Sequence, residues 1–247
     1  ESGPAGEVAR HLGVVHHTER LNVDDLLELL PLFREEFDEP FFDNSAFPVM
    51  AVSRLARRHV TVALSGDGGD ELFGGYHYYP IAKVLGGIYA LPGVVRSAGA
   101  SVIGMLGSHR ARMLSGALRQ RNVAEAFAFA RGISKDFGSV LREDVLEKTQ
   151  GMANLSGAMA RTHLPGLRAV DQATRLDMAF TLPDDYLQKV DVGSMAFSLE
   201  CREPMLDHLL VEWAMRLPDS WKVRGFGTKY LLRKLAYRYV PRRILDR

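Results

Sequence analysis

The stretch of sequence that decides the fold reads Leu64-Ser65-Gly66-Asp67-Gly68-Gly69-Asp70-Glu71-Leu72-Phe73-Gly74-Gly75-Tyr76. It continues Val60-Thr61-Val62-Ala63-Leu64, a short, nearly all-apolar run whose β-branched residues predict a buried parallel strand. The glycines after this strand let the backbone approach a ligand, and a helix is expected to begin near Asp70. Free N–H groups at a helix start favour anions, phosphate in particular. The loop lacks the Gly-Lys-Ser/Thr ending of a Walker loop, so it is not that nucleotide site.

Three carboxylates stand in the same loop, where phosphate oxygens would lie: Asp67, Asp70 and Glu71. Directly apposed to phosphate they would repel it, but with Mg²⁺ between them they fit, and a spare carboxylate can act as a base. The alternative is structural: Asp70 and Glu71 complement the helix dipole and Asp67 fills a turn. The pattern alone leaves both interpretations open.

Outward from the loop, the sequence predicts a strand–helix–strand α/β unit followed by a helical majority. The elements expected before the loop are a helix at 5–12 closed by Gly13, a strand at 14–21, a helix capped by Asn22 and kinked or split by Pro31, and a helix at 45–59. The pattern is almost wholly helical after Asp70. Phe127, Phe129 and Phe137 are interpreted as core residues.

The overall charge of the chain limits its partners. Lys and Arg number 31 against 30 Asp and Glu, so we expect no nucleic acid partner, since phosphate neutralisation usually leaves a basic excess. The basic stretch at 110–121 is interpreted as a solvated helix face or an interdomain contact. No apolar run is long enough to span a bilayer, so we expect no membrane partner. The single Cys201 and the lack of a signal peptide are compatible with the cytoplasm, and a homodimer is left open.

Five blocks of the chain, in order, resemble the synthetase domain of glutamine-hydrolysing asparagine synthases. They are the blocks at 38–40, 65–76, 189–196, 199–207 and 227–233. The resemblance implies a helix-rich α/β fold of the adenine nucleotide α-hydrolase-like type, a pyrophosphatase-loop and Rossmann-like domain. It would cover 1–247 as a truncated domain, with a parallel α/β part at 1–80 and a mainly helical part at 81–247.

The activity that the resemblance implies is ATP-dependent asparagine synthesis. The side-chain carboxylate of aspartate is adenylated, with ATP and Mg²⁺ as cofactors, and pyrophosphate leaves. Ammonia derived from glutamine then attacks, giving asparagine and AMP. Adenylation replaces a poor leaving group with a good one, and the attacking amine must be neutral, so a carboxylate base is useful.

Residue roles follow from the resemblance position by position. The catalytic candidates are Asp67, at a position where the family often has Glu, and Lys229, which matches a lysine thought to hold the α-phosphate. The candidates for substrate or nucleotide binding are Ser65, Gly66, Gly68, Asp70, Lys189 and Asp191, and Asp70 is also the candidate for the metal, through Mg²⁺–pyrophosphate. A solvated helix face competes as the explanation for the two lysines and Asp191, and Glu200 and Arg202 are expected to form a structural pair.

Two departures from the family pattern affect the expected activity. The chain holds no Ser-Gly-Gly-x-Asp-Ser pyrophosphate loop and no glutaminase domain with a leading cysteine; Cys201 is internal and is interpreted as a buried small residue. Both ends look cut, and we expect the isolated chain to be inactive. The open alternatives are a relative that amidates or cyclises another carboxylate (a surface polysaccharide, a β-lactam precursor or a peptide) and a non-catalytic scaffold.

Overall fold

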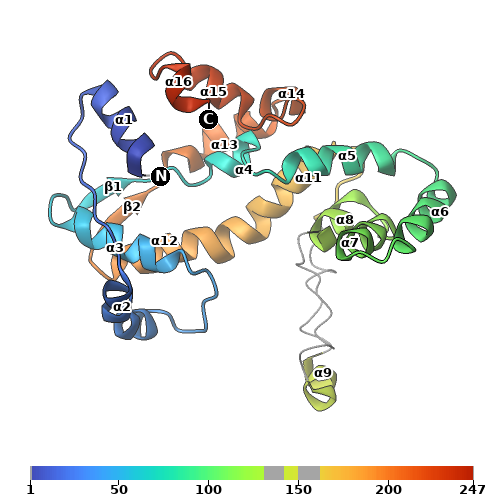
Figure 1. The fold of residues 1–247 in the computed structure, drawn as a ribbon, viewed down its shortest axis with the longest axis horizontal. Helices are drawn as coiled ribbons and strands as arrows, with labels where there is room; N and C mark the ends of the chain where they lie inside the picture. Colours follow the sequence, from blue (N-terminus) through green and yellow to red (C-terminus); the bar gives the residue numbers. More distant parts are fainter. Residues whose placement is uncertain (1, 131–141, 150–161, 247) are drawn as a thin grey trace. The chain divides into compact units, whose positions relative to one another are not determined.

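The chain folds into two compact units, as seen in the computed structural model (Figure 1). The structure describes residues 2–130, 142–149 and 162–246. Unit 1 comprises residues 1–73, 180–222 and 229–247, and unit 2 comprises residues 74–179 and 223–228. Helices beyond residue 81 therefore belong to both units. The predicted helix-rich α/β class is confirmed, and Phe137 lies outside the described residues.

Unit 1 holds both of the described strands and most of the described helices. Its elements are α1 (Ser2–Leu12), α2 (Val23–Glu36), α3 (Ala46–Arg57), β1 (Val62–Leu64), α4 (Gly69–Phe73), α12 (Gln188–Met195), β2 (Glu200–Arg202), the 3₁₀ turn η3 (Pro204–Leu206), α13 (His208–Met215), α14 (Asp219–Lys222), α15 (Tyr230–Ala236) and α16 (Arg242–Leu245). The π-helix η2 (Asp177–Leu187) contains the boundary between the units.

Local chemistry sets the first helices of unit 1. Gly13, with φ of 68°, ends α1 as predicted. The side chain of Asn22 accepts a hydrogen bond from the Asp25 N–H, and the Asp25 carboxylate accepts one from the Asn22 N–H, which completes a capping box at α2. Pro31 does not split the helix, because α2 runs through it. Pro31 is exposed, so water can satisfy the carbonyl that loses its N–H partner.

Two predictions about strands need correction. The segment 14–21 forms no strand, and Val15 is 82% exposed, because β-branched residues make a strand only where a partner strand pairs with them. The strand predicted at 60–64 exists as β1 and pairs in parallel with β2, Val62 opposite Glu200 and Leu64 opposite Arg202. It is not buried. Among the described residues the sheet has these two strands alone, and Val62 and Leu64 are exposed, whereas parallel strands are usually covered on both faces.

The core of unit 1 lies between α2, α3 and α12. Leu29, Phe37 and Met50 are buried there, and Val192 of α12 packs against them. Gly193 permits this contact, because a Cβ at that position would lie 3.2 Å from Val49. The core therefore fixes α12 beside the helices that precede β1.

Unit 2 is a helical cluster. Its described elements are α5 (Tyr79–Tyr89), α6 (Gly93–Gly104), α7 (His109–Leu118), α8 (Val123–Ala130), α9 (Glu143–Thr149) and α11 (Ala169–Leu176). Leu85, Ala100, Leu118 and Ala126 form its core, with Phe129 packed against them. Phe127 is buried, which confirms its interpretation as a core residue.

Candidate functional site

The glycine-rich loop leaves the carboxyl end of β1 within unit 1. The strand ladder continues one residue into it, because the Ser65 N–H donates to the Arg202 carbonyl at 2.9 Å. Ser65 and Asp67 are half-buried and Gly66 is exposed, with no atom near the position of a Cβ. Helix α4 then begins at Gly69. The predicted strand–loop–helix arrangement is confirmed, with a helix of five residues.

Gly68 is needed at its position for two reasons. Its φ is 84°, in the left-handed region that favours glycine, and a Cβ there would lie 2.2 Å from Cδ2 of Leu206. Leu206 belongs to the turn η3 that follows β2, so that turn packs directly beneath the loop. Gly68 is buried, and it allows two of the matched sequence blocks to meet.

Asp70 and Lys229 form an ion pair across the unit. The Nζ atom of Lys229 lies 2.9 Å from each carboxylate oxygen of Asp70, and both side chains are about one-third exposed, at 36% and 34%. Lys229 precedes α15 in a left-handed backbone conformation, with φ of 51° and ψ of 36°, which is uncommon for a residue with a side chain. The structure therefore brings together two residues that were predicted to bind different ligand groups.

Glu203 is a carboxylate that sequence reasoning missed. Burial raises the pKa of Glu203, and the nearby charges of Asp67 and Asp191 raise it further. A backbone hydrogen bond lowers the pKa of Glu203, but by less. Three acidic side chains therefore share one electrostatic environment next to the loop. Strand alternation offered a signal, since it places Glu203 on the side of β2 opposite to Glu200 and Arg202.

Lys189 is buried, and its ammonium group contacts three side chains. Its ammonium group donates to the Asp43 carboxylate and to the Ser45 hydroxyl, the latter at 2.7 Å, and lies 4.9 Å from the ring centre of Tyr186. Burial raises the pKa of Asp43, but hydrogen bonds from Lys189 and Ser45 lower it more, so that it lies below its ordinary value. The predicted binding residue Lys189 thus anchors the 38–45 loop to α12, while Asp191 on the same helix is exposed.

The remaining polar residues of β2 pair with each other. Nε of Arg202 donates to Glu200 at 2.7 Å, and both side chains are more than half exposed, so the expected pair is confirmed. Cys201 is a free thiol of intermediate exposure, less buried than expected.

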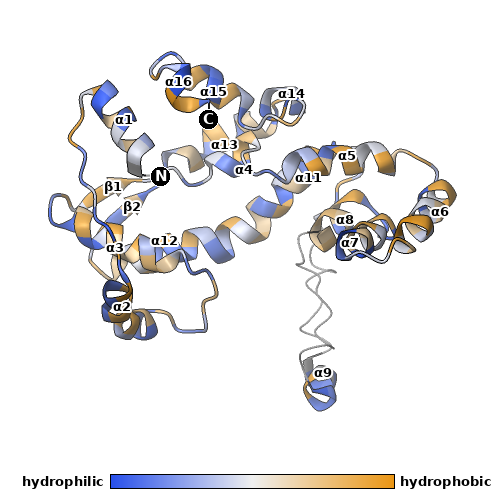
Figure 2. Cartoon of the chain, in the orientation of Figure 1, coloured by the Kyte–Doolittle hydropathy of each residue, from blue (hydrophilic) through white to orange (hydrophobic). Residues whose placement is uncertain are grey.

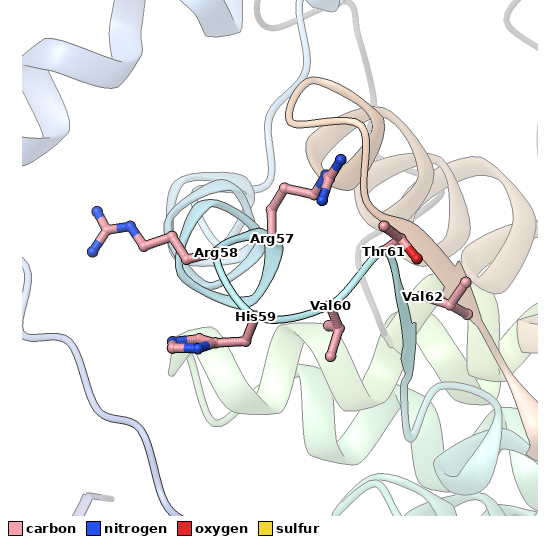
Figure 3. Close-up of a pocket in the computed structure, with 6 residues that line it drawn as sticks. All are labelled: Arg57, Arg58, His59, Val60, Thr61 and Val62. Atoms are coloured by element: carbon pink, nitrogen blue, oxygen red, sulfur yellow. The ribbon is translucent and has the colours of Figure 1, made fainter.

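An open pocket of about 480 Å³ lies at the opposite end of β1 (Figure 3). It is lined by Arg57, Arg58, His59, Val60, Thr61 and Val62. The two arginine side chains point away from each other, so no common point between them could hold an anion (Figure 3). Ligands of parallel α/β sheets bind outside the carboxyl ends of the strands, which is where the glycine-rich loop begins. The loop, and not this pocket, is the candidate site.

The described residues offer no ready metal centre. They contain no group of three or more His, Cys, Asp or Glu side chains that could hold a metal ion. Asp70, the predicted metal ligand, already has its charge compensated by Lys229. Asp70 stays the predicted contact for Mg²⁺ carried by a phosphate ligand, a mode of binding that needs only one or two protein carboxylates.

Comparison with known proteins agrees with the motif order. The sequence model of the family described as asparagine synthase matches residues 1–247. The glutamine-hydrolysing asparagine synthetase 1 of Bacillus subtilis (strain 168) is 30% identical over 250 residues, covering 98% of this chain and 38% of the relative. A putative glutamine-hydrolysing asparagine synthetase of Mycobacterium bovis is 32% identical over 244 residues, covering 97% of this chain and 36% of the relative.

The match covers only part of the length of the relatives, and it has no counterpart among solved structures. The chain spans a little over a third of the length of the curated relatives it matches. No solved structure matches the chain. The five motif blocks and the family match over all 247 residues lead to one conclusion: the chain belongs to the asparagine synthase family, whose fold is that of the adenine nucleotide α-hydrolases.

Proposed function

We propose that this chain forms part of an enzyme that makes an amide from a carboxylate and ammonia at the expense of ATP. In that reaction ATP activates the side-chain carboxylate of aspartate as an acyl-adenylate, and ammonia released from glutamine then displaces AMP. Membership of the asparagine synthase family supports the general chemistry. The aspartate substrate and the glutamine-derived ammonia come from the names of the relatives, which are glutamine-hydrolysing asparagine synthetases.

The observation that carries the proposal is the loop between β1 and α4. It presents an open backbone at Gly66, a hydroxyl at Ser65 and a carboxylate at Asp67 beyond the carboxyl end of a parallel strand. Such strand ends bind ligands in α/β folds. In the proposal, Ser65 and Gly66 contact the activated carboxylate while Asp67 faces the incoming amine.

Proton handling is assigned to Asp67 together with Glu203. An attacking ammonia must lose a proton as the amide forms, and a carboxylate within reach can accept it. Burial first, and the charges of Asp67 and Asp191 with it, raise the pKa of Glu203, and a higher pKa makes a carboxylate a stronger base. We assign Asp67 to orient the amine and Glu203 to accept, together with Asp67, the proton that the amine loses.

Lys229 is assigned to position Asp70 as well as to attract phosphate. A lysine that binds the α-phosphate in the resting protein would present a free ammonium group, but here Asp70 accepts from it at 2.9 Å. An anion reaching Lys229 must therefore compete with Asp70.

We further propose that the 247 residues alone do not turn over. The Ser-Gly-Gly-x-Asp-Ser loop that grips the ATP phosphates in the family is not among them. Release of AMP and pyrophosphate is to be measured with aspartate and ammonium, for this chain and for a chimera that joins the upstream region of the Bacillus subtilis relative to residue 1. Activity of the chimera alone, lost on Asp67→Asn and kept in the matched exposed variant Asp24→Asn, supports the proposal.

Other outcomes would decide between the alternatives. Activity of the 247 residues alone would show that the nucleotide site lies elsewhere in the chain. AMP release with a carboxylate other than aspartate would make the chain a family member with a different acceptor. A chimera that is folded yet inactive with every carboxylate tried would favour the scaffold.

A further inference from the structure

Charge in this chain is distributed very unevenly. The 53 residues from 72 to 124 contain no Asp or Glu, while they contain six cations: Lys83, Arg96, Arg110, Arg112, Arg119 and Arg121. The whole chain has a net charge of only +1. This acid-free segment forms α5, α6 and α7 of unit 2, so a local positive field arises there that the total charge conceals.

Helix α6 presents an apolar face to solvent. Val94, Ala98, Val102 and Met105 recur at a spacing of three and four residues, which places them on one side of a helix. All four are exposed, Val94 at 82% and Met105 at 86%, and Leu106 follows at 73%. Hydrophobic residues mark α6 in Figure 2. An α-helix at the surface of a globular protein normally turns its charged residues outward, and α6 does the reverse.

The one charged residue of α6 points inward. Nε of Arg96 donates to the Leu118 carbonyl at 3.0 Å, and its guanidinium lies 4.1 Å from the ring centre of Tyr89. Two exposed arginines of the following segment flank the apolar face instead. Arg119 donates to the Ser101 hydroxyl at 3.0 Å, and Arg112 donates to the Gly107 carbonyl. The apolar side chains are thus bordered by cations and by no carboxylate of the 72–124 segment.

We propose that this α6 face, defined as Val94, Val95, Val102, Met105 and Leu106 with Arg112 and Arg119 at its border, docks on the surface of a bilayer that contains anionic phospholipid. Aliphatic side chains can enter the boundary between headgroups and acyl chains, while the arginines meet the lipid phosphates. The described residues contain no helix able to cross a bilayer, so the contact is peripheral. The expectation of no membrane partner rested on spanning runs, which a surface contact does not need.

Other occupants fit less well. A second copy would bring arginines against arginines, and one short helix face offers fewer residues than the roughly 20–30 a side of a stable interface. Single-stranded nucleic acid is bound on aromatic side chains, and residues 90–122 contain no Phe, Tyr or Trp. An anionic bilayer offers phosphates to the cations and an apolar layer to the aliphatic side chains.

The test is co-sedimentation of the 247-residue chain with vesicles of phosphatidylcholine alone or mixed with phosphatidylglycerol. Binding to the mixed vesicles alone is expected, weakening at least tenfold between about 0.05 and about 0.3 M salt because the Debye length shortens. Arg112→Gln and Arg119→Gln should each weaken partitioning about fivefold, and Val102→Asp with Met105→Asp should abolish it. Val23→Asp and Arg216→Gln, which are exposed positions in unit 1, are the matched controls.

All the altered side chains are exposed, so each variant should fold, and circular dichroism checks this. Equal binding to both kinds of vesicle, or none to either, would overturn the proposal. So would a concentration-dependent dimer, seen by light scattering, that the Val102→Asp, Met105→Asp variant abolishes; that result would assign the face to a second copy. These outcomes are independent of the amide-forming activity.

Discussion

The packing of Leu206 beneath Gly68 can be tested with three glycines of unit 1. Gly68 combines φ of 84° with a neighbouring atom 2.2 Å from the position of a Cβ. Gly13 has φ of 68° and open space around it, and Gly66 has open space and no positive φ. Changing each to alanine therefore separates backbone strain from steric overlap.

The magnitudes follow from these geometries. Gly66→Ala should change the free energy of unfolding by no more than about 0.5 kcal/mol. Gly13→Ala should cost about 1–2 kcal/mol for the left-handed backbone. Gly68→Ala should cost that amount and about 1–3 kcal/mol more, because Leu206 has to leave its place.

Urea unfolding followed by tryptophan fluorescence suits the measurement. The chain has two tryptophans, Trp213 and Trp221, and both belong to unit 1, so the signal reports the unit that contains the loop. The partner change Leu206→Ala should make the extra cost of Gly68→Ala disappear, since the added methyl then enters the vacated space. Equal losses of stability for Gly68→Ala and Gly13→Ala, or an extra cost that survives Leu206→Ala, would refute the packing argument.

Three further predictions concern the charged groups of unit 1. Lys189→Met should destabilise the protein by about 3 kcal/mol because it leaves Asp43 without its partner. The pKa of Asp43 lies below its ordinary 3.8, so the stabilisation by the Asp43 carboxylate is complete above pH 3.8 and is lost as the pH falls below it. Asp43→Asn should flatten this acidic part of a pH–stability curve. The pKa of Glu203 is raised, so its ionisation destabilises the fold as pH rises through that pKa; Glu203→Gln should raise the melting temperature at pH 7 and have little effect at pH 4, and an equal effect at both would contradict it. A double-mutant cycle with Asp70→Asn and Lys229→Met should give a coupling of only about 0.5–1 kcal/mol, because both side chains are one-third exposed, and a value near zero would show that water screens the pair completely.

Local chemistry predicted part of this fold. The cap at Asn22, the end of α1 at Gly13 and the strand–loop–helix order around Gly66 depend on residues within a few positions of each other. Such features can be deduced from sequence because the hydrogen-bond partners are sequence neighbours. The failures at 14–21 and at β1 have the opposite cause, since burial of a strand depends on which other segments cover it.

The residues of the candidate site that are sequence neighbours could also be predicted, and the pairs that are distant in sequence could not. Asp67 and Asp70 could be recognised because they stand in one short loop. The pairing of Lys229 with Asp70, 159 positions apart, and of Lys189 with Asp43, 146 positions apart, could not, since neither depends on a local pattern. Two lysines expected to meet ligands therefore meet carboxylates of the protein.

This pairing constrains which ligands the loop can accept. An anion that binds Lys229 alone would leave the Asp70 carboxylate without its cation, and a cation that binds Asp70 alone would leave the Lys229 ammonium group without its anion. Each exchange replaces a protein ion pair of 2.9 Å with a ligand contact and a lone charge, at a cost of about 0.5–1 kcal/mol for side chains that are one-third exposed. A ligand that presents both signs of charge at a similar separation, as the α-carboxylate and α-ammonium groups of an amino acid do, would replace both partners at once and leave no lone charge. We therefore expect this ion pair to accept an amino acid, such as the proposed substrate aspartate, more readily than a phosphate alone.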